Sequence, residues 1–360
     1  MIQNNFIANN VFWGLKDNWW KQLYDGKYHK FGSAVFDKGL HDGNVEPGFY
    51  NSIKNASEYA AEQIGQPLTI ECYKKVHQLA CAHFPHVSPN QINVDKENIN
   101  NFRNTNCSCS RNLVKHSYEY ENEEQSNNRR LEFVLLHSVR WNLLSEDKIK
   151  TETGCKKELD KLIPLHIKER IVNQFTKTDY FSSKGIVIRD LLEKGNPFYE
   201  KAIESMEKVT EQLEASQKKL NLAKPFASLK INASGEETLV HIIYNYQNPI
   251  EIEEAIHKLI NDYNEKLQKL PFNSFERNAE ENELALNYIA ELFQNLEWLH
   301  PFFDGQGRTD LILLAKLLTE NGFNPSILYD PFYSTFEPLE KWISYLRDGI
   351  EAWKREKENI

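Results

Sequence analysis

The feature that most limits the possible folds of this chain is a short glycine-containing loop between two apolar helical stretches. Residues 280–299 repeat apolar side chains at helical spacing, and residues 308–322 contain the run LILLAKLL, which is apolar nearly all round. A helix without a polar face needs other elements around it, so the second stretch is predicted to be a central buried helix. Pro301 disfavours the α conformation at His300, which predicts that the first helix ends there.

Other periodic segments predict that the rest of the chain is mainly helical as well. Thr69 is a favourable N-cap for one of these helices, and Gly322 is a favourable stop for the central helix. An Asn-Ala-Ser-Gly turn between two β-favouring runs predicts a hairpin at about 228–247. The polar, Asn- and Ser-rich residues 85–128 predict irregular structure. Apolar spacing predicts further helices at 58–64, 69–84, 129–145, 163–176, 196–222, 250–270 and 337–355.

The overall charge and the distribution of apolar residues argue against several classes of protein. The formal net charge is −9, which disfavours a protein that grips nucleic acid nonspecifically. No run approaches the roughly 18 apolar residues of a membrane span, and the N-terminus does not resemble a classical signal peptide. The sparse, odd set of five cysteines predicts ordinary thiols. We expect a cytoplasmic protein or, from its Asn- and Lys-rich composition, a bacterial effector delivered into a host cell.

The loop HPFFDGQGR concentrates groups that act on phosphates. Gly305 and Gly307 allow successive backbone N–H groups to point into one concavity at a helix N-terminus, which is a site for anions. Arg308 adds a guanidinium suited to phosphate oxygens. Asp304 is an oxygen ligand of the kind that holds Mg²⁺ beside substrate phosphates. His300 accepts a proton near neutral pH, so it is a candidate general base.

Less specific readings of the same residues remain open. Phe302 is predicted to face the core and pin the loop. The loop as a whole is alternatively a plain helix connection with a surface Asp and Arg, but the convergence of these roles favours a catalytic site. His77 lies in an apolar helical stripe without a set of metal ligands around it, so it is predicted to be a packed or capping histidine.

The loop resembles the signature of the Fic/Doc superfamily, HPFx[DE]GNGRxxR. The hairpin at about 228–247 resembles the flap that aligns a target segment by strand pairing. The resemblance implies a mainly α fold, a Fic-like helical bundle with a small β-hairpin flap and a large helical insertion. The implied domains are an aromatic-rich N-terminal segment at 1–51, a core of 52–85 plus 226–350, an insertion at 86–225 and a charged tail at 351–360. The matching loop residues are His300, Pro301, Phe302, Asp304, Gly305, Gly307 and Arg308.

The same resemblance implies a function. A Fic-type enzyme transfers AMP, or a related phosphate-bearing group of a nucleotide such as ATP, onto a hydroxyl side chain of a target protein. By position, His300 is the general base and Asp304 is the Mg²⁺ ligand. The implied contacts to the nucleotide come from Phe302, Gly305, Gln306, Gly307 and Arg308.

Two positions of the loop depart from the family signature. Gln306 replaces an Asn, and Leu311, preceded by Asp310, replaces the final Arg that holds the far phosphates. These changes leave open a weaker grip on ATP, a reversed nucleotide, a different donor or an inactive site. The alternatives are therefore a nucleotide- or protein-binding module without turnover, and a hydrolase that removes such a modification. A family-type inhibitory pattern at 117–122 is not expected to act, because the Arg that it would neutralise is missing.

Overall fold

The structure is a computed structural model, and by its packing the chain divides into two compact units. Unit 1 comprises Met1–Cys107, Gln212–Ala227 and Tyr244–Ile360, and unit 2 comprises Ser108–Glu211 and Ser228–Ile243. The predicted helices at 129–145 and 163–176 lie outside the described residues. The described residues are 14–24, 44–84, 101–103, 107–111, 197–222, 227–231, 240–245, 248–271 and 273–360, together with the pair 40–41 and several single residues between 26 and 36.

The described chain is mainly helical, which confirms the predicted fold class. The short 3-10 helices are η1 (Lys16–Gln22) and η5 (Ser274–Glu276). The α-helices are α3 (Phe49–Glu62), α4 (Ile70–Ala80), α10 (Pro197–Leu220), α11 (Pro249–Leu267), α12 (Ala279–Leu299), α13 (Gln306–Glu320), α14 (Tyr333–Phe336) and α15 (Leu339–Glu358).

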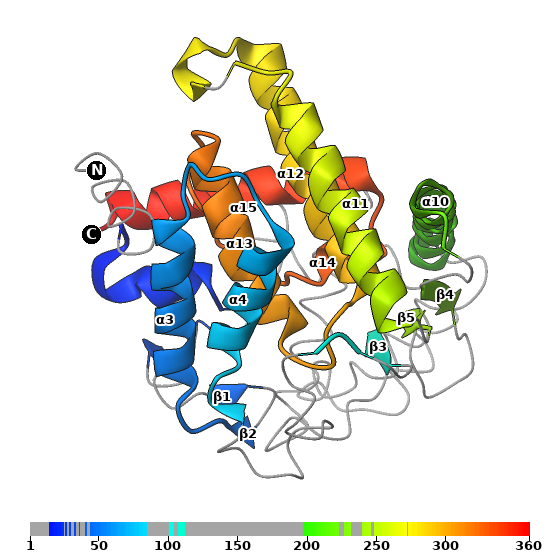
Figure 1. The fold of residues 1–360 in the computed structure, drawn as a ribbon, viewed down its shortest axis with the longest axis horizontal. Coiled ribbons are helices and arrows are strands. Elements are labelled where there is room, and N and C mark those ends of the chain that lie inside the picture. The colour runs from blue at the N-terminus through cyan, green and yellow to red at the C-terminus, as the bar shows by residue number, and fades with distance from the viewer. Residues whose placement is uncertain are drawn as a thin grey trace, which may run out of the picture. The chain divides into compact units, whose positions relative to one another are not determined.

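Helix α13 is the centre of unit 1, as its apolar sequence predicts. It packs against α3, α4 and α12, while α12 also contacts α11, α14 and α15 (Figure 1). Every residue from Thr309 to Leu318 is buried. Two of these, Ile312 and Ala315, join the same apolar cluster as side chains from α3 and α4. The loop that precedes α13 is therefore held at the end of a rigid, buried helix.

Helix ends in unit 1 follow the capping signals of the sequence. Thr69 accepts a hydrogen bond from the backbone N–H of Cys72 at the start of α4, which confirms the predicted N-cap. Asn278 caps α12 in a capping box with Glu281. Gly322 follows the end of α13 with φ +86°, so the predicted stop is also confirmed.

Several helix boundaries differ from the sequence prediction by a few residues, and three of them have a clear physical cause. Helix α13 begins at Gln306 rather than near Arg308, because Gly305 takes the left-handed N-cap position. Helix α3 begins at Phe49, well before residue 58, because its first turns bury apolar side chains. Helix α15 continues to Glu358, beyond the predicted end at residue 355. The ammonium of Lys357 lies over the Trp353 ring, which holds this last turn in place.

The strands form two small sheets. Strands β4 (Ala227–Ile231) and β5 (Val240–Tyr244) are hydrogen-bonded neighbours, as the predicted hairpin requires, and their connection lies outside the described residues. Strand β3 (Cys107–Arg111) pairs with the other edge of β5, so the prediction of irregular structure is wrong at these residues. Sheet pairing overrides a local sequence that lacks alternating apolar residues. The second sheet pairs β1 (Leu40–His41) with β2 (Asn44–Val45).

The aromatic N-terminal residues pack onto the helices. Trp19, Trp20 and Phe36 are buried in the cluster that contains α3, α4 and α13 side chains. The indole N–H of Trp353 in α15 donates to the Gln22 side chain at 2.9 Å. Residues 14–24 are thus joined to the far end of the chain.

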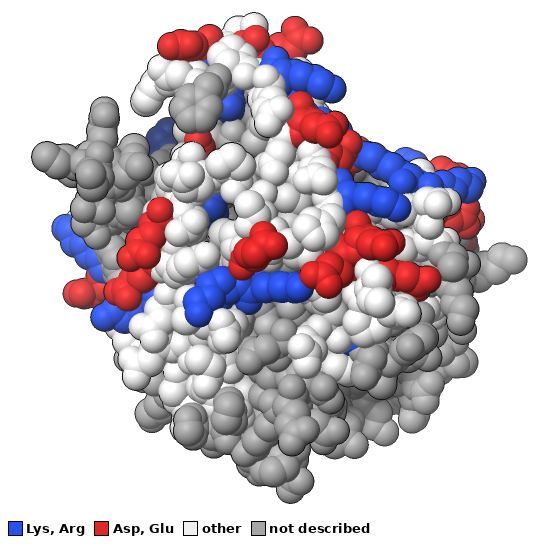
Figure 2. Space-filling model, viewed as in Figure 1, with Lys and Arg blue, Asp and Glu red and all other residues white. Residues whose placement is uncertain are grey.

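The described surface carries charges of both signs. On the face shown in Figure 2, Lys and Arg side chains lie interspersed with Asp and Glu side chains over the described helices. Such a mixed surface differs from the clustered basic patch of a nucleic-acid-binding protein. Among the described helices, none is both long enough and apolar enough to cross a membrane.

Candidate functional site

The loop between α12 and α13 is shaped by two residues in left-handed backbone conformations. His300 ends α12 with φ 44° and ψ 62°, and Gly305 begins α13 with φ 76°. A Cβ atom added at Gly305 would lie 2.2 Å from the Cys81 sulfur, so only glycine fits there. The chain therefore turns sharply twice and brings both ends of the loop to the same side of the helices.

The loop borders a cavity of about 180 Å³. Aromatic walls from Tyr24, Phe49, Phe303 and Phe332 enclose it. Six of the seven residues that the sequence predicts for the site line this cavity: His300, Asp304, Gly305, Gln306, Gly307 and Arg308. The structure thus brings the predicted base, metal ligand, backbone nest and guanidinium together at one hollow.

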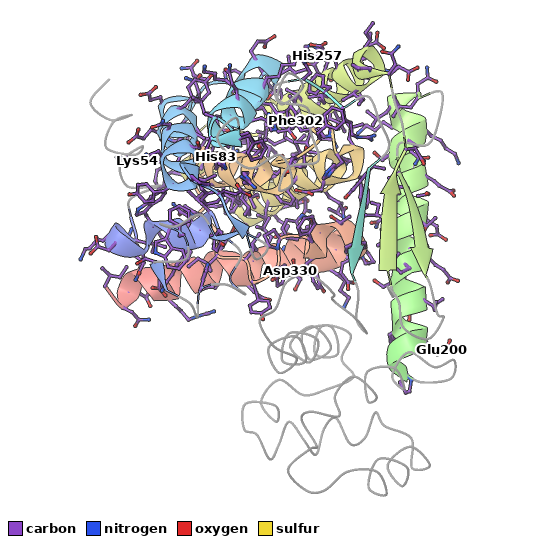
Figure 3. The ribbon with its side chains drawn as sticks, turned by 90° about the horizontal axis from the view of Figure 1, so that it is seen from below. Lys54, His83, Glu200, His257, Phe302 and Asp330 are labelled. Carbon is purple, nitrogen blue, oxygen red and sulfur yellow. The ribbon has the colours of Figure 1, made fainter. Side chains whose placement is uncertain are left out.

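Phe302 is the predicted site residue that does not line the cavity. Its ring is fully buried among the surrounding helices, where Figure 3 shows it. The His77 imidazole stacks on it with the ring centroids 3.7 Å apart. His77 also donates from Nε2 to the Asp304 carbonyl at 2.9 Å. Phe302 therefore pins the loop to the core, and His77 is the packed histidine that the sequence predicts. Burial lowers the pKa of His77 to about 4, so it is neutral near pH 7.

The imidazole of His300 is held by an aromatic ring. The Tyr244 ring stacks on it with centroids 4.1 Å apart and an angle of 14° between the planes. Its Nδ1 atom is buried without a hydrogen-bond partner among the described residues, which leaves Nε2 as the ring nitrogen for the cavity. Burial, with a smaller contribution from Arg103, lowers the pKa of His300 to about 3. The ring is therefore neutral at physiological pH, which is the protonation state that a general base needs.

Arg308 makes a paired contact that the sequence did not predict. Its Nη1 and Nη2 atoms donate to the two carboxylate oxygens of Glu46 at 2.8 and 3.3 Å. The guanidinium also lies over the rings of Phe49 and Phe84. Although burial lowers the pKa of Arg308, Glu46 raises it above its ordinary value, so the charge persists. His83, labelled in Figure 3, completes this group with its Nε2 atom 2.6 Å from Glu46.

A second buried group lies beneath the loop. Tyr73 donates to one Asp310 carboxylate oxygen at 2.9 Å, and the Gln306 amide donates to the other at 2.7 Å. The same amide nitrogen also donates to the Tyr73 hydroxyl at 2.6 Å. A further hydrogen bond joins the carboxyl groups of Asp310 and Glu297, which requires a proton on one of them. The Gln306 side chain is thus directed into the interior, so the contact of residue 306 with the cavity depends on its backbone.

The carboxylate of Asp304 lies at the rim of α13. One of its oxygens accepts from the Gly305 backbone N–H at 2.6 Å. No other hydrogen bond to this carboxylate is made by the described residues. Among them, no group of three or more His, Cys, Asp or Glu side chains forms a metal cage. A single open carboxylate beside a phosphate nest still fits Mg²⁺, which takes one or two carboxylates and completes its shell with phosphates and water.

Several residues of the site were missed by sequence reasoning. Glu46, Arg103 and Tyr73 reach the loop from positions more than a hundred residues away. Only Asp310 and Glu297 carried a local signal, since each lies one turn of helix from a loop residue. Their signal is that each is a charged residue inside an otherwise apolar helix, and such residues are uncommon unless they have partners.

We expect Gly305→Ala to destabilise the protein by at least about 1–2 kcal/mol, because a non-glycine residue is strained in this backbone conformation. The collision with Cys81 adds to this cost. Gly307→Ala is the matched control, since no atom lies within 4 Å of its added Cβ. Urea unfolding measures both variants. Equal stabilities of the two variants would contradict the prediction, and Cys81→Ala should partly restore Gly305→Ala.

The raised pKa of Asp310 predicts a pH dependence of stability. Burial raises this pKa to about 7, so the folded protein retains a proton that the unfolded chain releases. The resulting stabilisation is fully present below about pH 4 and is lost as pH rises through the folded pKa. Asp310→Asn does not lose it, so the variant should gain stability relative to the wild type between about pH 5 and 8. Urea unfolding of Asp310→Asn and of the wild type at about pH 5 and pH 8 tests this prediction. A stability difference between the two proteins that is the same at both pH values would count against it.

Comparison with known protein families matches residues 166–318 to the Fic/DOC family. The match contains α10, β4, β5, α11, η5 and α12, and it ends within α13. It therefore includes the whole loop from His300 to Arg308. It also overlaps both the predicted insertion and the predicted core, so those domain boundaries stay a prediction. No curated protein matches the chain.

Proposed function

Because residues 166–318 match the Fic/DOC family, we propose that the protein transfers AMP, or a related phosphate-bearing group of a nucleotide, onto a hydroxyl side chain of a target protein. The family is generally linked to transfer of nucleotide-derived groups onto proteins. The observation that carries the proposal is the cavity where the His300 imidazole, the 305–307 backbone and Arg308 converge.

The proposed reaction begins with proton transfer to His300. Its neutral imidazole accepts the proton of the target hydroxyl through Nε2. The hydroxyl oxygen forms a bond to the α-phosphorus of the donor, and the bond from that phosphorus to the leaving pyrophosphate breaks. Backbone N–H groups of Gln306 and Gly307 stabilise the charge on the transferred phosphate, while that of Gly305 holds the Asp304 carboxylate. Positioning and charge neutralisation supply most of the catalysis in such reactions. In this scheme the target segment is aligned by pairing with an outer strand of the sheet that contains the hairpin, β3 or β4, because both edges of β5 are already paired.

Asp304 is the residue that would hold Mg²⁺ in this reaction. A bound Mg²⁺ neutralises charge on the leaving phosphates. The carboxylate oxygen that is not bonded to Gly305 is the atom available for it. Beside Mg²⁺, the guanidinium of Arg308 is the second cationic group. It would bind a phosphate either together with Glu46 or in place of it.

The position of a radioactive label tests the proposed function. Purified protein is incubated with Mg²⁺, cell lysate and ATP labelled at either the α- or the γ-phosphate. Transfer of AMP labels a protein from the α-phosphate only, and omission of Mg²⁺ abolishes the label. The same pair of labels on other nucleotides identifies the donor base. Absence of label from every nucleotide would refute the proposal.

A second candidate is a nucleotide-binding module without turnover. It is supported by the Glu46 carboxylate, which occupies both terminal nitrogens of Arg308, and by Leu311 at the cavity wall. Calorimetry separates the two candidates. Tight binding of a nucleotide with no product over many hours favours the module, and multiple turnovers exclude it.

A further inference from the structure

Arg103 is a fully buried arginine that contacts the catalytic loop from 197 positions earlier in the chain. Its Nε atom donates to the His300 carbonyl at 2.6 Å, and its Nη2 atom donates to the Leu299 carbonyl at 3.1 Å. Its own backbone N–H donates to the Pro301 carbonyl at 2.8 Å. One residue therefore binds three consecutive carbonyls at the point where α12 becomes the loop.

The backbone at this point needs such a partner. The last carbonyls of a helix have no partner within the helix, and a cation is favourable beside them. His300 is also a non-glycine residue in the left-handed region, which is strained unless its surroundings hold it. The Arg103 guanidinium satisfies both requirements, because it is a fixed fork with several donors.

The same guanidinium reaches the residue next to the ring that stacks on the imidazole. Its Nη1 atom donates to the Asn245 carbonyl at 2.7 Å, and Asn245 directly follows Tyr244. Because Nδ1 of His300 has no hydrogen-bond partner among the described residues, its ring is oriented by its own backbone and by the Tyr244 ring. Arg103 therefore contacts both the backbone of His300 and the residue next to Tyr244.

We propose that Arg103 is the positioning residue of the proposed general base: it fixes the backbone of His300 and the segment that carries Tyr244, so that the imidazole faces the cavity. This inference rests on the proposed function. The competing explanation is a purely structural helix cap, which would stabilise the fold and leave the reactivity of the imidazole unchanged.

The charge of Arg103 gives the proposal a second measurable effect. Burial, together with this positive charge, lowers the pKa of His300 to about 3. The other charged side chains that line the cavity beside His300 are Glu297, Asp304 and Arg308, and the neutral Tyr244 ring covers one face of the imidazole. Removal of the Arg103 charge should therefore raise the pKa of His300 towards its ordinary value, although burial keeps it below 6.5.

Kinetics of three variants form the first test. Arg103→Met should lower kcat about a hundredfold, the effect of a misplacement of roughly 1 Å, with the KM for the donor unchanged. Arg103→Lys keeps the charge but loses the fork, so its kcat should also fall. Arg277→Met is the matched control, because Arg277 also donates to a main-chain carbonyl, that of Pro271, but near the other end of α12. Its kcat should equal that of the wild type.

An NMR titration of the histidine rings forms the second test, and it needs no turnover. The protein is labelled with ¹⁵N-histidine, and His300→Asn identifies the signal. In Arg103→Met the pKa of His300 should rise from about 3, while in Arg103→Lys and Arg277→Met it should not. If kcat and the titration of Arg103→Met both match Arg277→Met, the positioning role is refuted and the proposed function stands. If the wild type transfers nothing, the proposed function fails, and a titration shift in Arg103→Met then shows only that the Arg103 charge acts on His300.

Discussion

We expect His300→Asn to lower the rate of transfer by about 100- to 10,000-fold, the usual contribution of a general base. Asn cannot take the proton of the target hydroxyl, yet it keeps a planar polar group of similar size at the end of α12. The left-handed backbone of this residue also suits Asn, so the fold should survive the change. Initial rates with the labelled donor, at saturating donor concentration, measure the effect.

His257→Asn is the matched control for this change. His257 is exposed on α11 and lines no part of the cavity, as its place in Figure 3 indicates. Its rate should equal that of the wild type. The low pKa of His300 adds a further expectation, because a base that is neutral down to about pH 3 causes no loss of activity at mildly acidic pH. Equal rates for the two variants would remove His300 from the mechanism.

We expect Glu46→Leu to destabilise the protein by about 3–5 kcal/mol, because it leaves the buried guanidinium of Arg308 without its carboxylate. The side chains of Glu46 and Arg308 are only 12% and 5% exposed, so water replaces little of the lost interaction. Inorganic phosphate should stabilise this variant more than it stabilises the wild type, since the anion restores a partner for Arg308. Urea unfolding with and without phosphate measures both effects.

The exposed pair of Lys54 and Glu58 on α3 provides the control. Its charged atoms are 3.9 Å apart and both side chains are largely solvent-exposed, so Glu58→Leu should change stability by less than about 1 kcal/mol. Phosphate should act equally on this variant and on the wild type. A Glu46→Leu variant that is no less stable than Glu58→Leu, and insensitive to phosphate, would show that Arg308 offers no anion site.

The sequence predicted the helices well because their signals are local. The apolar run of α13, the Thr69 cap and the Gly322 stop each depend on a few neighbouring residues. The loop chemistry was predictable for the same reason, since His300, Asp304 and Arg308 lie within nine positions. Strand β3 was missed because its pairing with β5 is non-local and its sequence, Cys-Ser-Cys-Ser-Arg, has no apolar alternation.

The contacts that decide the electrostatics of the site could not be predicted in this way. Glu46 and Arg103 lie in segments without periodic patterns, and nothing near them in the sequence indicates Arg308 or His300 as a partner. The orientation of the Gln306 amide could not be predicted from the sequence either, because it depends on a hydrogen bond to Tyr73 in another helix. The family signature specifies which side chains are present at the loop, whereas packing between distant segments determines which way they face.

The attachment of α15 to residues 14–24 connects the cavity to a helix that does not line it. Tyr24 and Phe332 both wall the cavity, and Gln22, two residues before Tyr24, is bonded to Trp353 of α15. Local unfolding of α15 would therefore loosen the support of the wall that Tyr24 supplies, although no residue of α15 lines the cavity.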